Sequence, residues 1–350
     1  DFERNHSIIF FIKDTIKHLD KKRFRIHLFS FAKENTKDES QNDLKHLSDE
    51  WFNLNQLDNQ KVVNLIQKKK INILFDVMGF TNPNRLEIFN SRVAPIQISW
   101  LAYCNTIGFE TIDYIMIDKN LVIKNEEKFY LEKVIRLPKV WNSHAGFNLK
   151  RKYNKLPCEK DEIFTLGSFN NFRKISVETV DTWSSILQSV SNSRLILKSS
   201  TFCDTNFLLD KFKKNGVENK VKILDKVNFH KKKDHLELYN KVDLALDTFP
   251  YNGVTTTFEA LWMNVPVMVL KGYNFNSRCG ESIIKNTKID YLIASNTKEY
   301  IQKVIFLSQN RKKLNEMRRE LYDEVLSTPL FDTKSFAKDF GDCLLKVLNN

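Results

Sequence analysis

Two kinds of apolar pattern alternate along the chain. Stretches in which apolar residues recur about every 3.6 positions predict amphipathic helices, and short continuous apolar runs predict buried strands. The helices that we expect include 7–19, 60–69, 85–90, 177–190, 206–215, 232–240 and 333–348, and the strands include 24–31, 71–78, 96–101, 163–169, 194–198 and 221–224. Because helices and strands alternate, we expect an α/β fold with parallel strands and helices on both faces of each sheet.

The length of 350 residues is more than one compact core needs and suits two domains. Residues 148–161 are polar and have little periodicity, so they predict a linker. We therefore expect an N-terminal domain at 1–155, whose first strand would precede Asp1, and a C-terminal domain at 156–350 that includes the last helices. The polar stretch 33–43 predicts a loop, and no internal repeat appears along the chain.

Charge and cysteine content narrow the function classes. A net charge of +12 makes nucleic acid a candidate partner. However, the basic residues are scattered and form no nucleic-acid-binding motif, so we expect no such partner. Five cysteines without a C-x-x-C pair argue against a disulfide framework or structural zinc and favour a cytoplasmic location. No apolar run reaches the roughly 18 residues of a membrane span, so we expect none.

The stretch with the most chemical information is 243–269, D-L-A-L-D-T-F-P-Y-N-G-V-T-T-T-F-E-A-L-W-M-N-V-P-V-M-V. It predicts a strand, a turn closed by Gly253, a helix and a second strand. Thr255 and Thr256 fall at the helix start, where hydroxyls can cap N–H groups and the helix dipole favours an anion. Glu259, one turn later, can accept a hydrogen bond from a ribose hydroxyl. A diphosphate site and an ordinary threonine-capped helix both fit these residues.

This stretch closely resembles the sugar-nucleotide loop of the O-GlcNAc transferase and SPINDLY family of protein glycosyltransferases. Four further blocks follow the family order, at 1–6, 76–85, 92–103 and 167–175. The resemblance implies a GT-B fold, in which two doubly wound Rossmann-like domains face a cleft and the second domain holds most of the donor. Val254 and Glu259 stand where human-type members have histidine and aspartate, so the chain is more similar to bacterial and SPINDLY-type members.

The resemblance also implies roles for particular residues. Lys174, in G-S-F-N-N-F-R-K-I, matches the family's phosphate lysine, and Asn171 lies at a position near the same phosphates. His235 matches a histidine beside the base and ribose, with Lys232 three residues earlier. Thr255 and Thr256 match the paired phosphate threonines. Judged from spacing alone, Lys174 is a solvated lysine in a strand–helix loop and His235 a surface or capping residue.

His6 is the candidate for the active site in the first domain. It precedes a predicted helix, where a neutral imidazole can relay the proton of an acceptor hydroxyl or position the acceptor. The bland alternative is helix capping, which Asn5 or Ser7 can supply equally well. No metal site is expected, because Asp243 and Asp247 lie roughly 13 Å apart along a strand and the histidines have no metal-binding spacing. The sugar nucleotide is a co-substrate, and we expect no cofactor.

Together these observations and the resemblance predict a metal-independent enzyme, and the resemblance implies inversion at the anomeric carbon. It would transfer GlcNAc from UDP-GlcNAc to serine or threonine hydroxyls of proteins or peptides. Transfer of fucose from GDP-fucose, as the resemblance implies for the SPINDLY branch, is the near alternative. A catalytically silent module that only binds sugar nucleotide or peptide is the second alternative.

Overall fold

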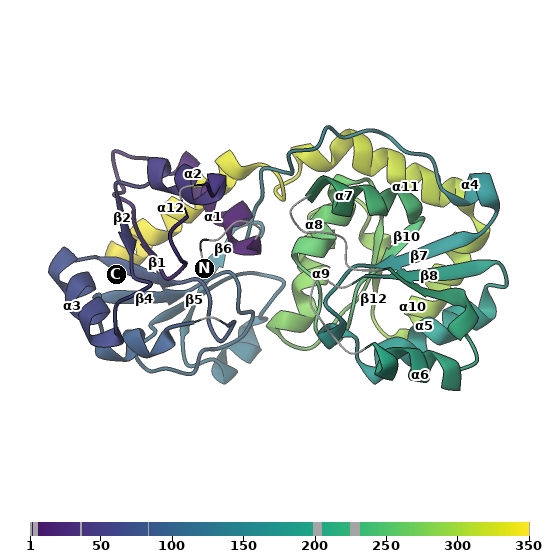
Figure 1. Cartoon of the computed structure of the whole chain (residues 1–350), viewed down its shortest axis with the longest axis horizontal. Coiled ribbons are helices and arrows are strands. Elements are labelled where there is room, and N and C mark those ends of the chain that lie inside the picture. The colour runs from purple at the N-terminus through teal and green to yellow at the C-terminus, as the bar shows by residue number, and fades with distance from the viewer. Residues whose placement is uncertain are drawn as a thin grey trace. The chain divides into compact units, whose positions relative to one another are not determined.

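The computed structural model describes residues 2, 6–35, 37–82, 84–198, 205–224 and 232–349, apart from the side chain of Lys232. The chain folds into two compact units (Figure 1). Unit 1 comprises Asp1–Ala145 and Pro329–Asn350, and unit 2 comprises Gly146–Thr328. The recorded strand pairs in both units are parallel, which confirms the α/β class.

Unit 1 contains two separate parallel sheets. The smaller pairs β1 with β2, and the larger has the order β3-β4-β5-β6. Its strands are β1 His27–Ser30, β2 Glu50–Asn53, β3 Ile73–Asp76, β4 Ile96–Ser99, β5 Tyr114–Asp118 and β6 Lys133–Leu137, and its α-helices are α1 Ser7–His18, α2 Glu39–Leu47, α3 Asn59–Lys69 and α12 Thr333–Asn349. Residues 86–91 form a 3-10 helix instead of the expected α-helix.

Unit 2 contains one six-stranded sheet with the order β12-β11-β10-β7-β8-β9. Its strands are β7 Phe164–Ser168, β8 Ser193–Leu197, β9 Val221–Ile223, β10 Leu244–Leu246, β11 Val267–Leu270 and β12 Ile293–Ala294. Its α-helices are α4 Cys158–Asp161, α5 Val177–Ser189, α6 Asn206–Lys214, α7 Lys232–Glu237, α8 Thr255–Trp262, α9 Phe275–Lys285, α10 Thr297–Gln309 and α11 Arg311–Glu324. Helices α5, α6 and α10 cover one face, and α7, α8, α9 and α11 the other (Figure 1).

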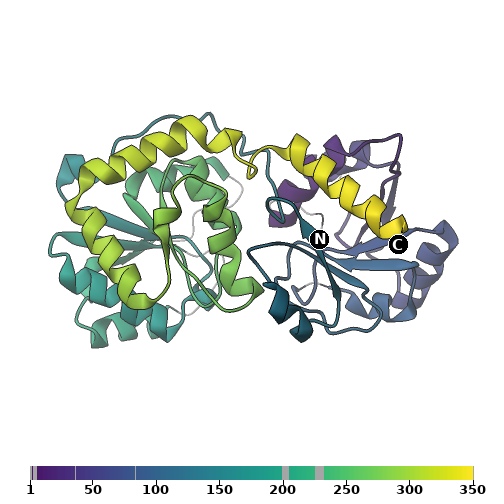
Figure 2. The same ribbon diagram turned by 180° about the vertical axis from the view of Figure 1, so that it is seen from behind.

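The domain boundaries differ from the expected 1–155 and 156–350, because the last helix belongs to unit 1. The chain passes from unit 1 to unit 2 after Ala145, and it returns after Thr328 so that α12 belongs to unit 1. Figure 2 shows α12, in yellow, beside the purple helix α1. The reason is apolar packing within unit 1, because the ring of Phe340 lies 4.7 Å from Trp100 and 5.5 Å from Phe75 between centroids.

Helix α2 begins at Glu39, within the stretch 33–43 that was expected to be a loop. Its N-cap Asp38 accepts hydrogen bonds from the N–H groups of Ser40 and Gln41 at 2.9 and 3.3 Å. The helix buries only Gln41 and Leu44. A helix with so few apolar residues shows no apolar period in the sequence. Its N-cap residue is therefore the sequence feature that indicates it. In the described part of the chain, no helix combines the length and apolarity that a membrane crossing requires.

Candidate functional site

The strand order of unit 2 places a ligand site at the carboxyl ends of β7 and β10. From this central pair the chain winds toward β9 on one side and toward β12 on the other. Helices therefore leave in opposite directions at this point, which opens a crevice where doubly wound sheets bind ligands. Three polar residues follow the neighbouring strands here: Asn170 after β7, Lys198 after β8 and Asp247 after β10. All three side chains are buried.

Asp247 organises the loop between β10 and α8. Its Oδ1 accepts hydrogen bonds from the N–H of Thr248 at 2.8 Å and from that of Gly253 at 2.7 Å. The side chain of Asn170 donates to the same oxygen at 3.3 Å. Burial raises the pKa of Asp247 to about 7. One carboxyl group therefore fixes both ends of the turn that the sequence placed before α8.

Gly253 closes this turn because a side chain does not fit there. A Cβ on Gly253 would lie 2.3 Å from Thr256 Oγ1 and 2.4 Å from Asn170 Oδ1. Those two atoms are themselves hydrogen-bonded, since the Thr256 hydroxyl donates to Asn170 Oδ1 at 2.7 Å. The loop, the helix start and the end of β7 are thus packed into one rigid unit.

The start of α8 contradicts the expectation that threonines cap it. The helix begins at Thr255 as expected, but its N-cap is Val254 and no side chain caps it. The hydroxyls are directed elsewhere: that of Thr256 to Asn170, and that of Thr257 to the carbonyl of Gly253 at 3.2 Å. Without a capping side chain, the positive end of the helix dipole is left for an anion.

Lys174 reaches this loop from the β7 side. It lies in the 3-10 turn Phe172–Lys174, whose N-cap Asn171 accepts a hydrogen bond from the N–H of Arg173 at 3.0 Å. Its Nζ donates to the carbonyl of Asn252 at 2.8 Å and lies 4.0 Å from the ring centroid of Tyr251. The structure thus brings Lys174 to the loop that leads to Thr255 and Thr256, whereas the Asn171 side chain serves its own turn.

His235 is held between two charged side chains. Its Nδ1 lies 2.8 Å from Lys198 Nζ, and its Nε2 lies 2.8 Å from Glu259 Oε2. Because a lysine amine donates, Nδ1 accepts, and the ring proton on Nε2 is donated to Glu259. Tyr239 also donates to Glu259 Oε2 at 3.2 Å. Both ring nitrogens are therefore engaged with protein, and the buried ring also lies beside those of Phe169 and Tyr239, at centroid distances of 6.1 and 5.9 Å.

This arrangement gives Glu259 partners within the protein. The residue is buried, and its carboxylate accepts hydrogen bonds from His235 and Tyr239. Glu259 thereby positions the His235 ring from within α8, and its expected contact with a ribose stays a prediction. The expectation for Lys232 lies outside the described residues, because only its backbone, in α7, is described.

His6, in unit 1, caps α1 itself. Its Nδ1 accepts from the N–H of Ile8 at 3.4 Å, so His6 has the helix-capping role that was the alternative expectation, which Asn5 or Ser7 could equally have supplied. Burial lowers the pKa of His6 to about 4, and the ring is neutral at physiological pH. With Nδ1 accepting, the ring proton is on Nε2, which suits hydrogen-bond donation to a ligand and not removal of its proton.

Sequence reasoning missed Asn170, Lys198 and Tyr239, and it considered Asp247 only as a metal ligand. A positional signal was present for three of them. Asn170, Lys198 and Asp247 each come directly or closely after a buried strand, and the carboxyl ends of adjacent parallel strands share one edge of the sheet. Tyr239 carries no such signal, because its contact with Glu259 depends on how the segment after α7 packs against α8.

Comparison with known proteins finds similarity over nearly the whole chain. The family model described as Glycosyl transferase family 41 matches residues 1–146 and 148–340. Over 338 residues the chain is 30% identical to the Arabidopsis thaliana protein named probable UDP-N-acetylglucosamine--peptide N-acetylglucosaminyltransferase SPINDLY. That match covers 95% of this chain and 37% of the relative. The Arabidopsis relative SEC, with the same enzyme name, is 28% identical over 93% of this chain and 34% of its own length.

A solved structure agrees with these matches. The structure of a mutant of the O-GlcNAc transferase from Thermobaculum terrenum has a TM-score of 0.89 and 28% identity, and the match covers 97% of this chain and 65% of that one. The GT-B fold expected from the resemblance is thereby confirmed. The chain spans about a third of the length of the curated relatives it matches. Its family is nevertheless plain: the chain belongs to glycosyl transferase family 41.

Proposed function

We propose that this protein transfers GlcNAc from UDP-GlcNAc to serine or threonine hydroxyls of proteins or peptides, with inversion at the anomeric carbon. The observation that carries the proposal is the convergence on one loop of Lys174, the half-buried Thr255 and Thr256, and the uncapped start of α8. A cation and a free helix N-terminus together suit a diphosphate. The names of the SPINDLY and SEC relatives favour UDP-GlcNAc as the donor and a peptide as the acceptor.

In the proposed reaction the acceptor oxygen attacks the anomeric carbon on the face opposite the diphosphate. The bond from that carbon to the diphosphate oxygen breaks, and negative charge grows on the leaving UDP. Lys174 and the N–H groups at the start of α8 stabilise this charge, which preorganised donors do most effectively when they are fixed before the reaction. Asp247 and Asn170 provide that fixation by holding the loop in one conformation.

Nucleoside recognition is assigned to the cluster around His235. With both nitrogens held by Lys198 and Glu259, the imidazole ring is fixed in one orientation. A fixed flat surface of this kind suits packing against a base or a ribose. Glu259 thus contributes to nucleoside affinity through His235. Lys232 and Asn171 remain in the proposal as donor-binding residues on the strength of the family resemblance alone.

His6 is proposed to contact the acceptor or the sugar. Because its Nδ1 caps α1, its Nε2–H donates a hydrogen bond that positions an oxygen of the substrate. The acceptor proton then leaves to another group or to water. Action without a metal ion also stays part of the proposal. The two aspartates considered as metal ligands accept hydrogen bonds from backbone N–H groups instead. Asp243 accepts from Cys158 and Thr165, and Asp247 accepts from Thr248 and Gly253, which supports this part of the proposal.

The proposal also keeps a cytoplasmic location, which the five widely spread cysteines without a C-x-x-C pair support, since cytoplasmic proteins keep their cysteines reduced.

Calorimetry and product analysis test this function directly. We would measure the affinities of UDP, GDP, UDP-GlcNAc and GDP-fucose, and follow sugar transfer to serine- and threonine-containing peptides by mass spectrometry, with and without EDTA. The expected result is preference for UDP-GlcNAc and transfer that survives EDTA. Fucose transfer would assign the other donor, binding without transfer or donor hydrolysis would indicate a silent module, and a strict need for Mn²⁺ or Mg²⁺ would refute the metal-free step.

A further inference from the structure

The loop between β10 and α8 presents an aromatic ring to Lys174. Tyr251 is 37% exposed, and its ring centroid lies 4.0 Å from Lys174 Nζ. An ammonium group over the face of an aromatic ring at this distance is attracted by the ring's negative face. The same ammonium donates to the carbonyl of Asn252, the next residue, at 2.8 Å. Two consecutive residues of one loop therefore hold the lysine.

The backbone around Tyr251 is itself fixed. Two residues earlier, the carbonyl of Phe249 accepts hydrogen bonds from the hydroxyls of Ser176 and Thr179 at 2.8 and 2.6 Å. The carbonyl of Tyr251 accepts from the Thr248 hydroxyl at 2.7 Å. A loop tied at these points holds its aromatic ring in place before any ligand arrives.

The chemical nature of these partners suits a lysine that binds an anion. A carboxylate would also hold the ammonium of Lys174, but its negative charge would weaken the attraction to a diphosphate. The ring of Tyr251 carries no net charge, so it orients the ammonium and leaves the positive charge for a ligand. Ordering a lysine side chain costs conformational entropy, and a lysine that is already ordered loses less on binding.

A second lysine–tyrosine pair in unit 2 provides a comparison. Lys303 Nζ lies 4.9 Å from the ring centroid of Tyr291, which is also 37% exposed. However, Lys303 forms an ion pair with Glu299 at 2.7 Å. The charge of Lys303 is thus compensated by a carboxylate, so this pair has the same ring contact without the charge that an anion site needs.

We propose that Tyr251 is a positioning residue for the diphosphate, whose ring holds the ammonium of Lys174 at the loop before α8. This role of Tyr251 rests on the proposed function, in which Lys174 stabilises the leaving diphosphate. Tyr251 acts through Lys174, and the ring face, not the phenol hydroxyl, has the effect.

Two substitutions separate the ring from the hydroxyl. Tyr251→Phe keeps the ring face and should retain turnover, whereas Tyr251→Leu should lower kcat roughly tenfold and change the KM for the donor little. Tyr291→Leu is the matched control and should leave kcat unchanged. In Lys174→Ala, adding Tyr251→Leu should lower kcat no further, because a residue that acts through Lys174 has no effect without it.

Proton NMR of the Lys174 side chain reads the contact without any ligand. Protons above a ring face are shifted upfield, so the ε-methylene signal that disappears in Lys174→Ala should lie upfield in the unsubstituted chain. It should stay there in Tyr251→Phe and return to the ordinary lysine position in Tyr251→Leu. If the chain transfers no sugar, calorimetric affinity for pyrophosphate replaces kcat, and we expect the same ranking of the variants.

Four results would overturn the role of Tyr251 alone, beside a Lys174→Ala that has lost activity. They are an ordinary ε-methylene position in the unsubstituted chain, full activity of Tyr251→Leu, an equal loss in Tyr251→Phe, and a further loss when Tyr251→Leu is added to Lys174→Ala. The last would mean that Tyr251 contacts the substrate itself. Full activity of Lys174→Ala would overturn this role together with the proposed function of Lys174.

Discussion

Each unit has a buried aspartate at the carboxyl end of a parallel strand, and the two aspartates are used differently. Asp247 follows β10 in unit 2, and Asp76 ends β3 in unit 1. Asp76 accepts from the N–H groups of Met78 and Gly79 at 3.1 and 2.9 Å, so it closes a turn of only a few residues. Asp247 holds the longer loop to Gly253. The shared framework positions the carboxyl group, and the length of the loop decides whether an anion site can form.

A second pair of positions teaches the same lesson. His6 caps α1 in unit 1, as Ser176 caps α5 in unit 2, where the Ser176 hydroxyl accepts from Thr179 N at 3.1 Å. Unit 1 therefore uses a reactive side chain for a task that serine performs in unit 2. Because capping and chemistry coincide in one residue, substitutions at His6 must separate the two roles.

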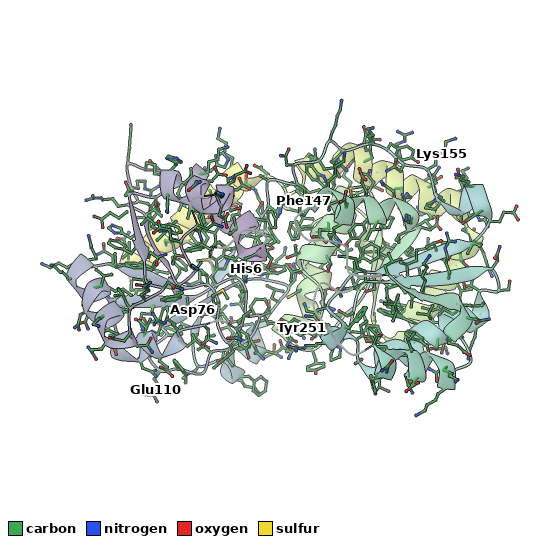
Figure 3. All side chains as sticks on the ribbon, in the orientation of Figure 1. His6, Asp76, Glu110, Phe147, Lys155 and Tyr251 are labelled. Carbon is green, nitrogen blue, oxygen red and sulfur yellow. The ribbon has the colours of Figure 1, made fainter. Side chains whose placement is uncertain are left out.

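The largest expected effect in unit 2 comes from Lys174. Lys174→Ala should lower turnover by about 10²–10³-fold, the loss seen when one preorganised donor at a developing charge is removed. The free energy of unfolding should hardly change, because a half-exposed lysine contributes little packing. Lys155→Ala is the matched control, since Lys155 is exposed and lies on the other side of unit 2 from Tyr251 in Figure 3. Steady-state kinetics measure the turnover of both variants. Full activity of Lys174→Ala would show that Lys174 is a surface residue without a role in the reaction.

In unit 1 the decisive substitution is His6→Asn. Asparagine is a good N-cap, so α1 should keep its stability, whereas His6→Ala should lose about 1 kcal/mol of the free energy of unfolding. Both should lower kcat/KM by roughly 10²-fold if Nε2–H contacts the substrate. Kinetics and urea unfolding separate the roles. If His6→Asn retained activity while His6→Ala lost stability, His6 would be a cap and nothing more.

Sequence reasoning predicted those parts of the fold that repeat a local pattern. The helices 7–19 and 177–190 and the strands 71–78 and 163–169 were found because apolar spacing alone identifies them. It missed β5 and β6, and it assigned α12 to the wrong unit because an amphipathic face does not reveal what covers it. Similarly, it placed Thr255 at the start of α8 but could not foresee that Asn170, 86 residues away, takes the Thr256 hydroxyl.

The two threonines of unit 2 should therefore differ. The Thr256 hydroxyl donates to the buried Asn170, so Thr256→Val should cost about 1–3 kcal/mol in the free energy of unfolding by leaving that amide oxygen without its donor. Since the Thr256 hydroxyl is used in this way, we expect the hydroxyl of Thr255 to be the one that donates to the diphosphate. Thr255→Val should weaken pyrophosphate and UDP binding by about 1 kcal/mol and leave stability unchanged. Urea unfolding and calorimetry measure the two quantities. If both variants changed the free energy of unfolding and the ligand affinities equally, the two hydroxyls would not have the different roles assigned to them.

The finest comparison of the two units is the pH dependence of the free energy of unfolding. Burial raises the pKa of Asp76 from 3.8 to about 6, and that of Asp247 from 3.8 to about 7. Each folded unit therefore keeps a proton that the unfolded chain has released, so the free energy of unfolding falls as pH rises from about 4 to the folded pKa and levels off above it.

Asparagine at either position can still accept from the turn N–H groups but cannot ionise. In Asp247→Asn the free energy of unfolding of unit 2 should no longer fall as pH rises to 7. In Asp76→Asn the free energy of unfolding of unit 1 should no longer fall as pH rises to 6. Between pH 6 and 7, therefore, only Asp247→Asn should change the pH dependence. NMR-monitored urea unfolding, with separate signals for β10 and β4, follows each unit across the pH range. If the free energy of unfolding of unit 2 still fell with rising pH in Asp247→Asn, a group other than Asp247 would take up the proton on folding. The loop would then be held by an ionised Asp247.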